Sequence, residues 1–133
     1  MLTEKDYCDY ETCVALKELG FNNLVDWYFN EEKSIVSSLA RYRNTYIPRI
    51  SLYEAQKFLR EEKGLHIEVY ACAGGYIYEL CKAYKPNSFS GGTTIYTPND
   101  VDNPKLNDAG RYDDFETCLS EGIKEAVKIL KEE

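Results

Sequence analysis

The segment from Ser51 to Lys82 constrains the fold more than any other part of the chain. Ser51, followed three residues later by Glu54, forms a capping box, the pattern that satisfies exposed amide groups at the start of a helix. The residues after Ser51 place apolar side chains at helical spacing: Leu52, Ala55, Phe58 and Leu59. Gly64 is typical of the residue that ends a helix. The pattern therefore predicts an amphipathic helix over 51–63.

A β-hairpin is predicted directly after this helix. Residues 65–72 alternate between apolar and polar side chains, as a strand with one buried face does. Gly74-Gly75 then predicts a two-residue turn, so that residues 76–82 return antiparallel. In that register Glu68 lies opposite Cys81. One face is apolar and is expected to join the core, and the other is mixed: His66, Glu68, Tyr70, Cys72, Ile77, Glu79 and Cys81.

Two further helices are predicted near the ends of the chain. Apolar residues at helical spacing, followed by Gly20, predict a helix over 7–19. A continuous apolar stripe predicts another over 113–131, with acidic residues at its start and lysines at its end, where they complement the helix dipole. The two helices start alike, because Tyr10-Glu11-Thr12-Cys13 nearly matches Phe115-Glu116-Thr117-Cys118. Four residues do not make a repeat, so we interpret the match as shared helix-start chemistry.

The remaining segments predict strands and loops. Residues 24–29 are rich in aromatic side chains and predict a short strand. Residues 93–97 predict a further strand of the hairpin sheet. Residues 35–47 fit either a returning strand followed by a loop or a short helix. The polar residues 98–110 predict a loop of a length that is usually functional or mobile.

Together these elements predict a single α+β domain over 1–133, since 133 residues is the size of one ordinary domain. We expect a small antiparallel sheet of three or four strands, with its central hairpin at 65–72 and 76–82. About three helices pack against it: 7–19, 51–63 and 113–131. No apolar run is long enough to cross a bilayer, and the N-terminus lacks the pattern of a signal peptide. The sequence therefore predicts a cytoplasmic protein with no membrane partner.

The net charge of −7 argues against binding to nucleic acid, which needs a net basic surface. The charge is uneven, however, because residues 34–53 contain three arginines and no acid. Arg41, Arg43 and Arg49 are interleaved with aromatic residues, a combination that can hold phosphates and stack on bases. A nucleic-acid-binding accessory protein therefore stays as an alternative, although nucleic acid is not the favoured partner.

The cysteines and the single histidine give weak evidence for catalysis. No pair of the five cysteines has the C-x-x-C spacing of a zinc or redox site, and small buried side chains are the simplest interpretation. A cluster of His66, Glu68 and Cys81 is the one catalytic hypothesis, and the least favoured, because a carboxylate beside a thiol raises the thiol's pKa. No metal or cofactor is predicted. The sequence favours a protein that is not an enzyme.

Twelve tyrosines and one tryptophan are the most unusual feature of the composition. Tyrosine offers a large, rigid contact area with a polar tip, so a surplus suits an interaction surface. The predicted surface is a tyrosine-rich face of the hairpin sheet: Tyr70, Tyr76, Tyr78, Glu68, Glu79 and His66. We therefore expect a non-enzymatic module that binds a protein partner. A homodimer is also compatible with the sequence if an edge strand is exposed.

Residues 50–70, followed by 75–80, carry a resemblance to a known group of proteins. The chain resembles small uncharacterised proteins encoded in prophages and mobile elements of gut bacteria. Those proteins run from a helix ending in Leu-Arg-Glu, through a His-Ile strand, to a tyrosine-rich strand, and they close with a helix like 112–130. The resemblance covers about half of the chain and implies a phage or mobile-element setting. Its motifs are structural, so it implies no site residue.

Overall fold

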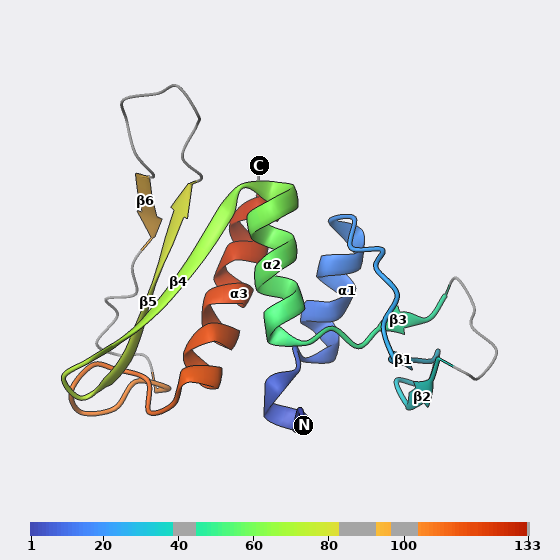
Figure 1. Ribbon diagram of the computed structural model, residues 1–133, viewed down its shortest axis with the longest axis horizontal. Helices are drawn as coiled ribbons and strands as arrows, with labels where there is room; N and C mark the ends of the chain where they lie inside the picture. Colours follow the sequence, from blue (N-terminus) through green and yellow to red (C-terminus); the bar gives the residue numbers. More distant parts are fainter. Residues whose placement is uncertain (39–44, 83–92, 97–103, 133) are drawn as a thin grey trace.

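The computed structural model describes residues 1–38, 45–82, 93–96 and 104–132. The elements follow in this order: η1 (Glu4–Asp6), α1 (Tyr10–Glu18), β1 (Trp27–Phe29), β2 (Ile35–Ser37), β3 (Ile47–Pro48), α2 (Leu52–Lys63), β4 (Leu65–Cys72), β5 (Gly75–Lys82), β6 (Thr93–Tyr96) and α3 (Phe115–Lys131). Two antiparallel sheets form, β4-β5-β6 and β2-β1-β3. Figure 1 shows them at opposite ends of the molecule, with the three helices between them. The predicted α+β class is confirmed.

Helix α2 starts and ends where the sequence predicts. The Ser51 hydroxyl accepts a hydrogen bond from the Glu54 N–H at 3.1 Å, and the Glu54 carboxylate accepts one from the Ser51 N–H at 3.2 Å. Gly64 adopts a left-handed conformation with φ 66°. A residue with a Cβ rarely takes that conformation, so the glycine lets the chain leave the helix and enter β4 at once.

The β4–β5 hairpin forms, but its register differs by two residues from the expected one. Glu68 pairs with Glu79, and Cys81 lies opposite His66. The expected pairing of Glu68 with Cys81 is therefore wrong. Because the slip is two residues and side chains alternate with a period of two, every residue keeps the face that the sequence predicts.

The position of Gly75 explains the different register. The turn consists of Ala73-Gly74, whereas Gly75 belongs to β5. A Cβ on Gly75 would lie 2.3 Å from the carbonyl oxygen of Tyr112, which crosses beside the strand. Tyr76 and Tyr112 also exchange backbone hydrogen bonds of 2.9 Å. Gly75 is thus required for the close approach of two backbones and not for the turn. The residues next to Gly75 in the sequence do not indicate this approach, because Tyr112 is distant in the chain.

Helices α2 and α3 cover the apolar face of the hairpin sheet. Gly122 of α3 lets the helix come close, since an added Cβ would lie 2.8 Å from the Ile67 side chain and 3.3 Å from the Tyr78 ring. The core contains fully buried aliphatic side chains from both helices and the sheet: Leu52, Leu59, Leu80, Leu119 and Ile123. Burying one such side chain contributes about 1.5–3 kcal/mol, so this interface is a major source of stability.

Helix α1 begins three residues later than predicted, because Asp9 acts as its N-cap. The Asp9 carboxylate accepts a hydrogen bond from the Thr12 N–H at 2.8 Å. Asp114 caps α3 in the same way, through the Thr117 N–H at 2.7 Å. The similar sequences at the two helix starts therefore carry the same capping chemistry, as interpreted.

The second sheet is built from segments whose pairing the sequence left open. β1 lies in its centre and pairs with β2 on one side and β3 on the other. Residues 35–47 thus begin as a returning strand, while 39–44 lie outside the described residues. The predicted strand at 93–97 forms as β6 and pairs with β5. Strands of two or three residues carry no pattern that specifies a partner, which explains why one sheet was expected.

The described part of the predicted polar loop, 104–110, is tied to the hairpin turn. The Asn107 side chain donates to the Gly74 carbonyl at 2.9 Å. Its oxygen accepts hydrogen bonds from the N–H groups of Ala109 and Arg111. This part of the segment therefore has a structural role, and it positions Tyr112 beside β5. Residues 97–103 lie outside the described part of the chain.

Candidate functional site

The outer face of the hairpin carries four of the six residues predicted to form an interaction surface. The Tyr70 ring is 43% exposed, and its hydroxyl donates to Glu79 at 3.0 Å. His66 Nδ1 lies 3.6 Å from a carboxylate oxygen of Glu68. The helices lie on the other side of the sheet (Figure 1), so none of them covers this face.

The other two residues of that predicted surface point toward the core. Tyr78 is only 3% exposed, and its ring stacks on Tyr112 with centroids 6.0 Å apart. Tyr76 is half-buried and meets the Phe115 ring edge-on. The expectation that Tyr78 lies on an exposed surface is therefore wrong. Strand alternation is the reason, because residues 76, 78 and 80 of β5 share the face that α3 covers.

The proposed catalytic cluster of His66, Glu68 and Cys81 does not converge in an enclosed site. The observed register brings Cys81 opposite His66, while Glu68 faces Glu79. The side chains of His66 and Glu68 are 33% and 61% exposed. Water therefore reaches these two side chains, and their charges are screened. Within the described residues, no three His, Cys, Asp or Glu side chains are arranged to hold a metal ion.

The sequence suggested buried cysteines, and three of the five are buried, whereas Cys72 and Cys81 are half-buried. Cys8 and Cys13 flank the first turn of α1 in the positions of a hydrophobic staple. Their mutual hydrogen bond, together with burial, raises the pKa of Cys8 well above its usual range, and the same bond lowers the pKa of Cys13. Cys13 has no exposed surface, so this more acidic thiol is out of reach of a substrate. Burial raises the pKa of Cys118 to about 12.

The arginines proposed for nucleic-acid contact are not gathered in the described residues. Arg41 and Arg43 lie outside them. Arg49 is half-buried, and its guanidinium stacks on the Tyr7 ring at 3.9 Å from the centroid. Such a cation–π contact orients the side chain and covers one of its faces.

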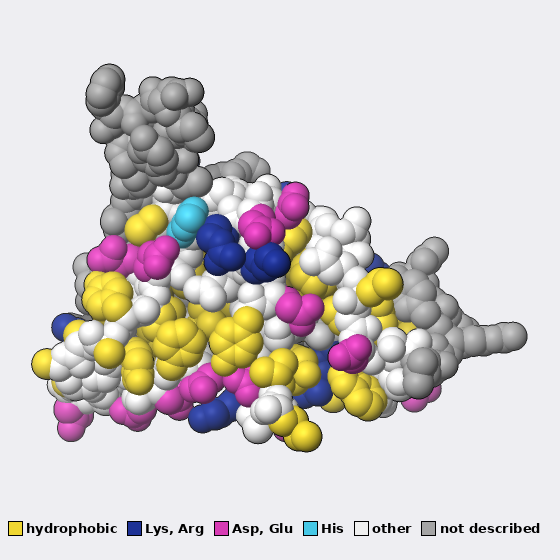
Figure 2. Space-filling model, viewed as in Figure 1, with side chains coloured by type: hydrophobic (Ala, Val, Ile, Leu, Met, Phe, Trp, Pro, Cys, Tyr) yellow, Lys and Arg dark blue, Asp and Glu magenta, His cyan; other side chains and the backbone are white. Residues whose placement is uncertain are grey.

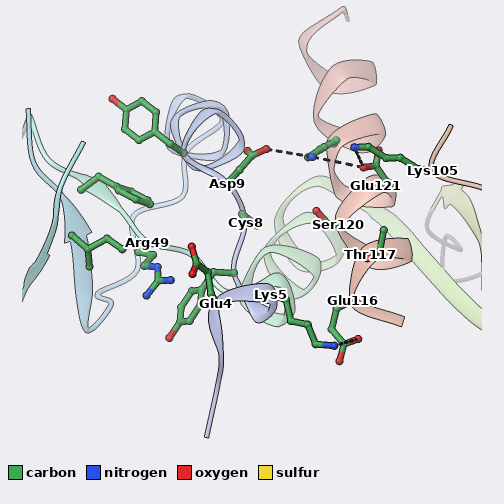
Figure 3. A pocket seen from close by; sticks show the side chains of 15 residues that line it. Glu4, Lys5, Cys8, Asp9, Arg49, Lys105, Glu116, Thr117, Ser120 and Glu121 are labelled. Atoms are coloured by element: carbon green, nitrogen blue, oxygen red, sulfur yellow. Dashed lines mark hydrogen bonds and ion pairs between the residues drawn. The ribbon is translucent and has the colours of Figure 1, made fainter. Parts of the chain in front are cut away.

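A cleft of ≈ 660 Å³ opens between the start of α1, the small sheet and α3 (Figure 3). One wall is mainly aromatic and apolar: Tyr7, Tyr10, Phe29 and Ile35. The facing wall is the polar side of α3: Glu116, Thr117, Ser120, Glu121 and Lys124. The cleft therefore joins an apolar surface from the N-terminal half of the chain to a polar surface from its last helix.

Ion pairs across this cleft connect its walls. The Lys124 ammonium lies 3.3 Å from a carboxylate oxygen of Asp9 and 3.7 Å from one of Glu121. Lys105 also pairs with Glu121, and Lys5 lies 3.8 Å from Glu116. Burial favours a higher pKa for Asp9, but hydrogen bonds from Thr12 and the charge of Lys124 outweigh it and lower the pKa. These charges stabilise the fold and neutralise one another, which leaves little net field for a charged ligand.

A second surface lies at the other side of Arg49, and we call it the Trp27 patch: Leu2, Leu24, Val25 and Trp27. Leu24 is 89% exposed and Trp27 43% exposed. The four residues line a hollow of ≈ 230 Å³ together with Tyr7, Asp26, Arg49 and Glu54. Leu24 also lines a neighbouring hollow along α2. Figure 2 shows hydrophobic side chains gathered over the lower part of one face, near the N-terminus and the starts of α2 and α3.

Sequence reasoning did not identify the Trp27 patch. It assigned residues 24–29 to one strand, which implied that alternate side chains would be buried. The observed strand begins only at Trp27, so Leu24 lies outside any ladder. The only sequence feature that pointed to this patch was the single tryptophan in a very short strand.

No protein-family model, curated protein or solved structure matches this chain. The resemblance to prophage and mobile-element proteins therefore stays a prediction. Of the helices in the described residues, none combines the length and the apolar character that a membrane span requires.

Proposed function

We propose that this protein is a non-enzymatic module that binds another protein through the Trp27 patch. The supporting observation is that the only tryptophan of the chain and a nearly fully exposed leucine lie beside a hollow lined by Tyr7 and Arg49. Tryptophan, tyrosine and arginine dominate the residues that carry binding energy in protein interfaces. Single exposed apolar side chains are ordinary, whereas several around one hollow are typical of an interaction site.

The chemistry of the hollow indicates what the partner offers. Its volume of ≈ 230 Å³ suits one aliphatic or aromatic side chain of the partner. Among the described residues Arg49 makes no ion pair, so its outer face can receive a hydrogen-bond acceptor next to that side chain. We therefore expect a partner segment in which an apolar anchor is followed closely by a polar or acidic group.

The two alternatives have less support. Nucleic-acid binding would need a basic surface, but the chain carries a net charge of −7 and Arg49 is engaged with Tyr7. An enzyme would need an enclosed reactive group, but His66 lies on an open face and Cys13 is buried. No contact or surface in the described residues favours either alternative over an interaction module.

Affinity capture with designed variants tests the proposal. The full chain is immobilised and exposed to a lysate of the source organism, beside Leu24→Glu and Trp27→Ala. Loss of a central aromatic anchor costs about 2 kcal/mol or more, so recovery of the partner should fall about tenfold or further. Tyr53→Ala is the matched control, because it removes a 39% exposed aromatic ring that does not line the hollow.

The proposal fails if Leu24→Glu and Trp27→Ala recover the same proteins as the unmodified chain. It also fails if nothing is enriched above an unrelated acidic bait. A binding assay with nucleic acid at low salt tests the nucleic-acid alternative. Affinity that appears there and falls steeply with added salt would favour nucleic-acid binding instead.

A further inference from the structure

The backbone of β4 has an outward-facing side. In the described residues β4 is the edge of its sheet, because the strand order is β4-β5-β6. Tyr76 of β5 directs its N–H and C=O toward Tyr112, away from β4. Ala71 is the residue opposite Tyr76, and in an antiparallel ladder both members of such a pair turn their polar groups away from each other. Ala71, and by alternation Val69 and Ile67, therefore point their backbone groups out of the sheet edge.

Among the residues that the structure describes, only the first half of this edge has a covering contact. The Gln56 side chain of α2 donates to the Ile67 carbonyl at 2.9 Å, which agrees with the outward direction of that carbonyl and satisfies it. Figure 1 shows α2 and β4 diverging after Gly64, so the helix does not follow the strand to its end. Within the described residues, no hydrogen bond reaches the outward backbone groups of Val69 or Ala71, and Ala71 is exposed.

The uncovered half of β4 lacks the usual protection of an edge strand. Proline, lysine, bulges or a very short length normally prevent an edge from pairing with another chain. β4 has eight residues, contains neither proline nor lysine, and pairs with β5 without a bulge. The other side of β5 differs, since β6 and Tyr112 occupy it and the register shifts between Leu80 and Cys81. The exposed end of β4 is therefore the place where another strand can be added.

We infer that a second copy of this chain adds its own β4 to this edge in antiparallel orientation, with the two-fold axis at Tyr70. Val69 of each copy then pairs with Ala71 of the other, and each such pair exchanges two backbone hydrogen bonds. The two Tyr70 side chains lie directly opposite each other on the outer face. Cross-strand aromatic pairs of this kind stabilise a sheet, and the dimer forms one continuous six-stranded sheet around the axis.

The strand's own chemistry selects this register. An axis at Val69 would pair Ala71 with Ile67, whose carbonyl Gln56 already occupies. An axis at Glu68 would set two carboxylates directly opposite each other, which is destabilising. The axis at Tyr70 uses only the uncovered groups and places the 43% exposed rings against each other. Because this edge is complementary to itself, we infer that it pairs with the same edge of a second copy of the chain.

This inference goes beyond the proposed function and does not depend on it. Figure 1 shows the hairpin and the small sheet with β1 at opposite ends of the molecule. A dimer through β4 would therefore leave both Trp27 patches open, and it would present two of them together. Loss of partner binding and loss of dimerisation are measured with different variants, so failure of one proposal is distinguishable from failure of the other.

Sedimentation of the full chain at increasing concentration, up to about 1 mM, tests the dimer. The mass should rise from 15.4 kDa toward twice that value. Ala71→Pro removes an outward N–H that the β4–β5 ladder does not use, and it should weaken dimerisation tenfold or more. Ala73→Pro is the matched control, because it places proline in the turn at a position where proline is favoured. Circular dichroism shows that each variant is folded.

Tyr70→Lys provides a second variant if Ala71→Pro does not fold, since it sets like charges opposite each other across the axis. A register test uses Glu68→Cys, whose thiol should form an intermolecular disulfide with the second copy's Cys72 in oxidised glutathione. A chain that stays monomeric at every concentration would overturn the inference. A dimer that both Ala71→Pro and Tyr70→Lys leave unchanged would overturn it as well. Binding of an unrelated extended peptide to the β4 edge, by a chain that does not dimerise, would also overturn it.

Discussion

Gly75→Ala is the substitution that tests the hairpin most directly. The added Cβ would lie 2.3 Å from the Tyr112 carbonyl oxygen and 3.1 Å from the Arg111 Cβ. A clash with a backbone atom cannot be relieved by rotating a side chain, so Tyr112 must move. The two hydrogen bonds of 2.9 Å between Tyr76 and Tyr112 are then lost. Gly75 also has φ 144°, a conformation that an alanine adopts only under strain.

The expected loss in the free energy of unfolding has two parts. Holding a residue with a Cβ at such a φ costs about 1–3 kcal/mol. Losing two backbone hydrogen bonds costs about 1 kcal/mol each. Together they give about 3–5 kcal/mol, which is a large fraction of the stability of an ordinary domain, about 5–15 kcal/mol.

Denaturant unfolding, followed by the fluorescence of Trp27 and by circular dichroism, measures this loss. Gly20→Ala is the control, because Gly20 has φ 110° but no heavy atom lies within 4 Å of its added Cβ. That variant should show only the conformational cost of about 1–3 kcal/mol. Equal losses for the two variants would refute the close approach of Tyr112 and would favour a register in which Gly75 belongs to the turn.

Three further predictions use the same unfolding measurement. Ser51→Ala should lower stability by about 1 kcal/mol, because a capping hydroxyl is removed, and an unchanged midpoint would contradict the capping box. Gly122→Ala should destabilise the protein, because overpacking of the added Cβ against Ile67 costs about 1–3 kcal/mol. This cost outweighs the preference of a helix for alanine over glycine, which is about 1 kcal/mol. A stabilised variant would show that α3 does not lie this close to the sheet. Asp9 and Asp114 have folded-state pKa values below the ordinary 3.8, so their stabilisation is present above that pH and is lost as the pH falls through the lowered values. The double variant Asp9→Asn, Asp114→Asn should therefore lose less stability between pH 5 and pH 2 than the unmodified chain, and an identical acid profile would count against this role.

The sequence by itself determined the elements whose limits depend on residues close in the chain. Ser51 and Glu54 lie three residues apart, so their capping box specifies the start of α2 without further information. Alternation over residues 65–72 predicted which side chains of β4 share a face, because the period of a strand does not depend on its partner. It did not predict how far the core extends, since Ala71 on the apolar face is exposed. The same reasoning applies to α3, whose apolar stripe and acidic start are local features.

Only the tertiary structure decided which segments meet. The register of the hairpin depends on Tyr112 crossing beside Gly75, and these two residues are far apart in the sequence. The burial of Tyr78 follows from the approach of α3 at Gly122 in the same way. The Trp27 patch exists because β1 pairs in a separate sheet and leaves Leu24 outside it. Composition reports how many aromatic side chains are present, but whether one is buried or exposed depends on which distant segment packs against it.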